Sequence, residues 1–90
     1  MLINLYSVNF YLYGVLMRAV QLRMARVALG LGVRELAAKA GVTANTITRI
    51  EKGADARQST IDRLRAVLQT AGVEFIDENG GGPGVRLQKR

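Results

Sequence analysis

The stretch LGLGVRELAAKAGVTANTITRIEKG, residues Leu29–Gly53, decides the fold of this 90-residue chain. Val33–Ala40 has the composition of a short helix, and Gly41 follows it as a stop. The hydroxyl of Thr43 can cap a second helix, Ala44–Lys52, by accepting a hydrogen bond from a backbone N–H of its first turn. The stretch therefore predicts two short helices joined by a tight turn.

Two short helices joined in this way, the second carrying exposed polar residues, form a helix-turn-helix. The glycine of the turn lies where the backbone needs a positive φ, which glycine adopts without strain. Ala37 must be small, because the second helix crosses close to it. The positions expected to hold the motif together are Leu36, Ala37, Gly41, Val42, Ile47 and Ile50.

Two further helices are expected on either side of the motif, because one helix pair cannot bury its apolar residues alone. Arg18–Leu29 has apolar residues at helical spacing. Ser59, with Asp62 three residues later, is expected to cap a fourth helix that ends near Thr70. The result is a mainly α fold with a four-helix domain over residues 17–70. The fourth helix is expected to bury Ile61, Leu64, Val67 and Leu68.

Residues 71–90 predict a short C-terminal β-hairpin. Val73–Ile76 and Val85–Leu87 are β-like runs, and the turn-rich loop DENGGGPG separates them. Two strands this short are marginal alone, and a second copy can cover their unpaired edge. The residues expected at this dimerisation element are Val73, Phe75, Val85 and Leu87.

The stretch Leu29–Gly53 resembles the phage-repressor (Cro-like, XRE) helix-turn-helix regulators. It nearly completes the pattern LA-x-x-x-G-V-[TS]-x-x-T-I-x-x-I-E-x-G, and with the outer helices the resemblance covers about residues 18–70. The resemblance implies a lambda-repressor-like four-helix domain that binds double-stranded DNA. Family members often have Gln at the first position of the first motif helix, where this chain has Val33. Arg34 beside it is a candidate for contact with a phosphate.

The helix 44–52 is the expected recognition helix, whose N-terminal part enters the major groove. Arg49 can pair with O6 and N7 of guanine, and Asn45 with N6 and N7 of adenine. Ala44 and the methyl group of Thr48 can pack on a thymine methyl. A helix face that is merely solvated is the alternative interpretation of these four positions.

Further residues are expected to contact phosphates or to support the recognition helix. The resemblance implies an ion pair, because a Glu at the position of Glu51 pairs with an Arg of the first helix, here Arg26. Such a pair orients the first helix against the third, and two independent surface charges are the alternative. The expected phosphate contacts are Arg34, Thr43, Thr46, Lys52 and Arg57.

The charge distribution agrees with a polyanionic partner. The chain has 13 Lys+Arg against 7 Asp+Glu, and the net charge of +6 lies within residues 17–70. The chain has no Cys and no His, which excludes disulfides, Cys-based zinc sites and nucleophiles built from Cys or His. We therefore expect no enzyme activity, no metal and no cofactor. The lack of Cys fits the cytoplasm.

Residues 1–16, MLINLYSVNFYLYGVL, carry no charged side chain. They are too short to span a membrane comfortably, and no basic region precedes them as in a signal peptide. The leading interpretation is a dispensable apolar extension upstream of a native start at Met17. The alternatives are an element that packs against the domain and a membrane or partner contact.

Together these observations predict a sequence-specific, double-stranded DNA-binding transcriptional regulator of the cytoplasm. Repression is the expected mode, because occupying a promoter blocks transcription, and a homodimer is the expected state. The alternative function is an antitoxin-like protein-interaction module, which binds a partner protein as well as its own operator.

Overall fold

The computed structural model describes residues 17–89, and the extension predicted at residues 1–16 lies outside them. The mainly α fold with a C-terminal hairpin is confirmed, and most element boundaries fall within a residue of those predicted. The described elements are, in chain order, α2 (Ala19–Ala28), α3 (Val33–Ala40), α4 (Ala44–Glu51), α5 (Gln58–Thr70), β1 (Val73–Ile76) and β2 (Gly84–Leu87).

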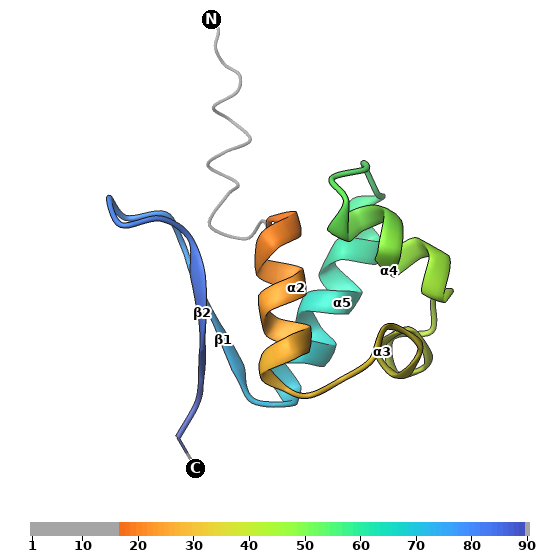
Figure 1. The fold of residues 1–90 in the computed structure, drawn as a ribbon, viewed down its shortest axis with the longest axis horizontal. Coiled ribbons are helices and arrows are strands. Elements are labelled where there is room, and N and C mark those ends of the chain that lie inside the picture. The colour runs from red at the N-terminus through yellow and green to blue at the C-terminus, as the bar shows by residue number, and fades with distance from the viewer. Residues whose placement is uncertain (1–16, 90) are drawn as a thin grey trace, which may run out of the picture.

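Helix α2 is the central element of the fold (Figure 1). The β-hairpin lies along one side of α2, and the pair α3 and α4 lies on the other side. Helix α5 contacts α2, α3 and β1, and so joins the helical part to the hairpin. The two helices of the motif and the hairpin are therefore held on opposite sides of one helix.

The hydrophobic core fills the space between the four helices and the first strand. Helix α2 contributes Leu22, α4 contributes Ile47, and both side chains are fully buried. On α5, Leu64 and Leu68 are fully buried, while Ile61 and Val67 pack against the core and are half-buried. The buried hydrophobic residues are Met17, Leu22, Ala25, Leu36, Ala37, Ala40, Ile47, Ile50, Leu64, Leu68, Val73 and Phe75.

Gln21 attaches the hairpin to α2. Its side chain is 2% exposed, and its Nε2 donates to the carbonyl oxygens of Ile76 at 3.0 Å and Gly84 at 2.9 Å. Its Oε1 accepts a hydrogen bond from the backbone N–H of Arg18, just before the helix begins. Because a buried polar group without a hydrogen-bond partner is unfavourable, these bonds both stabilise the buried amide of Gln21 and fix the position of the hairpin on α2.

The hairpin pairs β1 and β2 in an antiparallel register that sets Val73 opposite Leu87 and Phe75 opposite Val85. These four side chains share one face, because side chains alternate along a strand. On that face Val73, Phe75 and Val85 pack against the helices, and the guanidinium of Arg65 lies 4.9 Å from the centre of the Phe75 ring.

The burial of Val73 and Phe75 changes the expectation for a dimer. Both were predicted as contacts with a second copy, but their side chains lie 0% and 8% exposed in the core of their own chain. Val85 is half-buried against the same core, whereas Leu87 keeps 54% of its surface exposed. Of the four predicted residues, Leu87 offers the most surface to a partner.

The start of α5 corrects one local prediction. The N-cap residue is Arg57 rather than Ser59, and no side chain caps it. The backbone N–H groups of Thr60 and Ile61 both donate to the carbonyl oxygen of Arg57, which begins the helix two residues earlier than expected. Asp62 does not cap, because its carboxylate accepts a hydrogen bond at 2.8 Å from the side chain of Gln58, one turn before it.

Candidate nucleic-acid interface

The turn between α3 and α4 depends on a left-handed backbone at Gly41. This residue has φ 70° and ψ 33°, a region that other residues adopt with strain. The backbone N–H of Val42 donates to the carbonyl oxygen of Ala37 at 3.0 Å and closes the turn. Ala37 itself is 4% exposed in the core, which agrees with the need for a small residue there.

Helix α4 begins at a capped N-terminus. The Oγ1 of Thr43 accepts from the backbone N–H of Thr46 at 3.1 Å, as the sequence predicted. The two threonine hydroxyls also lie 2.9 Å apart and share a hydrogen bond. Both groups are at the surface, so the start of α4 presents hydroxyls and backbone N–H groups together, a favourable place for an anion.

An ion pair between Arg26 and Glu51 ties α2 to the end of α4. Nε of Arg26 donates to Oε2 of Glu51 at 2.7 Å, and Nη2 donates to Oε1 at 2.9 Å. The side chains are only 15% and 9% exposed, and Nη1 of Arg26 also donates to the carbonyl oxygen of Leu31 at 3.1 Å. The hydrogen bonds and charge of Glu51 raise the pKa of Arg26 above its usual value, despite the opposing effect of burial. The guanidinium therefore stays charged at any working pH.

Of the four predicted base-contacting residues, Asn45 and Arg49 lie on the outer side of α4, whereas Ala44 packs against the core. Ile47 and Ile50 are 0% and 5% exposed and face the core. Asn45 and Arg49 are exposed, whereas Ala44 and Thr48 are half-buried. A helix anchored on one side, with polar side chains projecting from the other, is suited to reading base edges in a groove.

Exposed cations surround this helix. Arg34 lies in the first turn of α3, Lys52 directly follows α4, and Arg57 precedes α5. Within residues 17–89, none of these three side chains has a hydrogen bond or an ion pair. The acids of α3 and α4 are engaged elsewhere, since Glu51 binds Arg26 and Glu35 accepts from the backbone N–H of Gly32 at 2.8 Å. The three exposed cations are therefore available to attract an anion.

Two residues that contact other elements, Arg63 and Gln21, escaped the sequence analysis. Arg63 of α5 reaches the turn, where its Nη1 lies 3.8 Å from the position that a Cβ on Gly41 would occupy. Only the three-dimensional packing of α5 reveals this contact. Gln21, described above, is likewise invisible to a pattern, because glutamine is common on exposed helix surfaces. Val33, at the position where glutamine was expected from the family resemblance, packs half-buried against the core.

Comparison with known proteins defines the class to which this chain belongs. Residues 19–75 match the family model described as a helix-turn-helix domain. The match covers more than half of the chain, so the chain belongs to this helix-turn-helix DNA-binding family. The comparison with curated proteins gave no match. The narrower resemblance to Cro-like, XRE repressors stays a prediction.

Metal sites and membrane-spanning helices are not found in the described part of the chain. Between residues 17 and 89, no group of three or more acidic, Cys or His side chains is arranged to hold a metal ion. No helix in that part of the chain is long and apolar enough to cross a membrane.

Proposed function

We propose that this protein is a cytoplasmic transcriptional repressor of the Cro-like type, which binds one double-stranded DNA sequence as a homodimer. One observation supports the proposal most strongly. Helix α4 exposes Asn45 and Arg49, while Ile47 and Ile50 on its opposite side are buried in the core. The Arg26–Glu51 pair and the Thr43 cap hold both ends of this helix. A rigidly held helix with exposed polar groups can discriminate between bases, because discrimination needs fixed geometry.

The proposed base contacts follow from the chemistry of the side chains. Arg49 donates two hydrogen bonds to O6 and N7 of guanine, and Asn45 pairs with N6 and N7 of adenine. Each such bidentate pair contributes about 1–3 kcal/mol of discrimination. Ala44 and the methyl group of Thr48 pack on thymine methyls and complete the proposed readout.

Phosphate contacts supply most of the proposed affinity. Arg34, Lys52 and Arg57 are exposed cations, and the hydroxyls of Thr43 and Thr46 lie at the N-terminus of α4. Each neutralised phosphate releases condensed counterions, so the logarithm of the binding constant falls with the logarithm of the salt concentration. Removing Lys52 is expected to weaken binding to every sequence and to reduce that slope by about one.

Repression follows from occupancy. A homodimer presents two copies of α4, and two-fold symmetry suits half-sites about 34 Å apart, one turn of DNA. A dimer bound across a promoter excludes the transcription machinery without any catalysis or ligand. In this proposal the regulated gene includes the protein's own, so the DNA upstream of its coding sequence is the first target to test.

The test is a titration of the 90-residue chain against that upstream DNA at several salt concentrations, beside a scrambled duplex of equal length. We expect tight, salt-sensitive binding that prefers the upstream DNA. Arg49→Ala is expected to lower the affinity for the preferred duplex by about tenfold or more, in line with loss of one bidentate pair.

Arg86→Ala is the matched control, because it removes the same charge from the exposed face of β2, where Arg86 pairs with Glu74 at 3.2 Å. This variant should keep the preference for the upstream duplex. Equal, weak binding of all duplexes by the wild type and the Arg49→Ala variant would contradict the proposed role of α4. It would favour the protein-interaction module instead.

A further inference from the structure

Arg63 of α5 is an exposed cation that lies at the turn between α3 and α4. Its Nη1 is 3.8 Å from the position that a Cβ on Gly41 would occupy, and α5 packs against α3. Within residues 17–89 the guanidinium of Arg63 has no hydrogen bond and no ion pair. Its charge is therefore available to an anion from outside the chain.

The acids of the three neighbouring helices have partners of their own. On α5, the carboxylate of Asp62 accepts a hydrogen bond from Gln58 at 2.8 Å. On α3, Glu35 accepts from the backbone N–H of Gly32, and on α4, Glu51 binds Arg26. None of these acids neutralises the guanidinium beside the turn.

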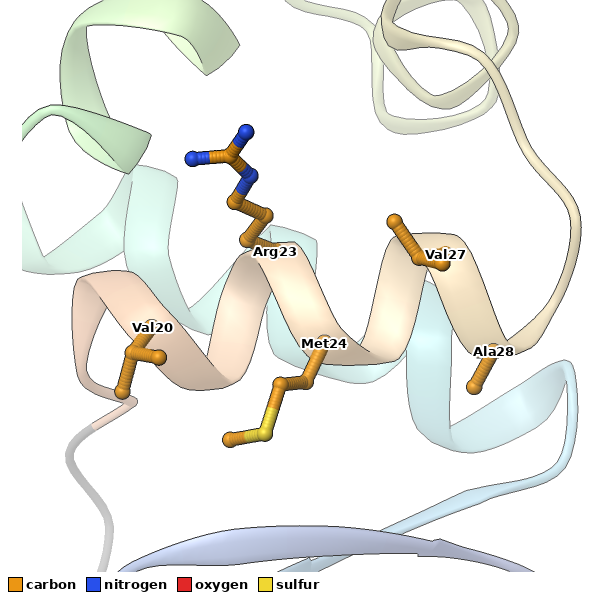
Figure 2. Close-up of a pocket in the computed structure, with 5 residues that line it drawn as sticks. All are labelled: Val20, Arg23, Met24, Val27 and Ala28. Atoms are coloured by element: carbon orange, nitrogen blue, oxygen red, sulfur yellow. The ribbon is translucent and has the colours of Figure 1, made fainter.

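Exposed cations gather at the C-terminal end of α4. Lys52 directly follows this helix, and Glu51, its last residue, pairs with Arg26 of α2. Figure 2 shows Arg23 of α2 directed away from the hairpin. Arg23 is exposed and lies one helical turn before Arg26, on the same side of α2. Positive charge is therefore already present where α4 ends.

The start of α4 has a different character. Thr43 and Thr46 are the contacts predicted there, and their hydroxyls are neutral. Thr43 follows Gly41 by two residues, which places the Arg63 guanidinium within about 13 Å of the start of the helix. The major groove is about 12 Å wide, and phosphates border it on both sides. A helix whose start enters the groove therefore has phosphates at about the distance of Arg63.

We propose that Arg63 is a further DNA contact, which binds a backbone phosphate beside the start of α4. The inference rests on the proposed function, because it takes α4 as the recognition helix. A guanidinium suits this partner, since its planar N–H donors can bind two phosphate oxygens at once. Arg63 and Lys52 then flank the inserted helix at its two ends. A phosphate contact carries no sequence information, so Arg63 strengthens binding to every duplex.

The experiment titrates the full 90-residue chain and its Arg63→Gln variant against the upstream duplex and the scrambled duplex at several salt concentrations. Loss of one phosphate contact is expected to reduce the slope of log K against log salt by about 0.9. Binding to both duplexes should weaken by about five- to tenfold at about 0.1 M salt. Arg63→Lys keeps the charge and should keep most of the slope.

Arg86→Gln is the matched control. It removes the same charge from the hairpin, which lies on the other side of α2 from α4 (Figure 1). This variant should keep the salt slope of the wild type. Urea unfolding of each variant separates a structural role from a contact, because a residue that only supports the turn changes the stability and not the salt slope.

An unchanged salt slope for Arg63→Gln would overturn the inference, even if the variant loses stability or its preference for the upstream duplex. An equal reduction of the slope by Arg86→Gln would also overturn it, because net charge alone would then explain the effect. The proposed function fails separately: a wild-type chain that binds both duplexes equally reads no sequence, yet the comparison with Arg63→Gln still measures the phosphate contact. A chain that binds neither duplex would refute both.

Discussion

A single buried side chain, Gln21, joins the helical domain to the hairpin. Replacing it with leucine leaves the carbonyl oxygens of Ile76 and Gly84 without their donor. We expect Gln21→Leu to lower the free energy of unfolding by about 1–3 kcal/mol in urea denaturation, since orphaned buried acceptors are unfavourable. Gln69→Leu, at an exposed position of α5, is the control and should change it little. Equal stability of the two variants would show that the Gln21 hydrogen bonds contribute nothing net.

The ion pair between Arg26 and Glu51 also contributes to the stability of the fold. A double-mutant cycle with Arg26→Met and Glu51→Gln measures its coupling energy in urea denaturation. We expect a coupling energy of about 1–3 kcal/mol, because both side chains are mostly buried and doubly hydrogen-bonded.

The pH dependence of this pair has a definite sign on the arginine side. The pKa of Arg26 is raised, so the stability that it contributes is present below its unfolded value and is lost only as pH rises through the higher folded value. Between pH 6 and pH 9 Arg26 stays protonated, because this range lies roughly 3 units or more below the reference pKa of arginine. Its titration therefore causes no change in the free energy of unfolding over that range. A coupling energy near zero would contradict a supporting role for the pair.

The turn between α3 and α4 is a local structure that glycine makes possible. Gly41→Ala forces an L-residue into the left-handed region, and we expect a loss of about 1–2 kcal/mol in thermal or urea unfolding. No neighbour prevents the added methyl, since the nearest atom would lie at an ordinary contact distance of 3.8 Å. Gly84→Ala is the control, because its φ is not positive and its Cβ would meet open space. A similar loss at both positions would contradict the conformational explanation.

The elements show which features a sequence can predict. Helices α3 and α4 were predicted almost to the residue, because glycines and a threonine cap fix their ends locally. The cap at Ser59 was wrong, because several polar residues there compete to begin a helix and only backbone geometry decides among them. The hairpin was predicted, but the inward packing of Val73 and Phe75 was not, since a strand pattern does not tell which chain covers its apolar face.

At the scale of the whole molecule, the candidate site was predictable in outline. Spacing alone indicated that Asn45 and Arg49 share the exposed side of α4, and both are exposed. The approach of Arg63 to the turn depends on how α5 packs against α3, which no local pattern encodes.

The central claim is that α4 reads a particular DNA sequence, and selection from a pool of random duplexes tests it most directly. The account predicts enrichment of a two-fold symmetric site whose half-sites lie about one turn of DNA apart, centre to centre. Each half-site should contain a guanine whose preference disappears when the selection is repeated with Arg49→Ala. A pool that stays random, or an enriched site unchanged by Arg49→Ala, would contradict the account.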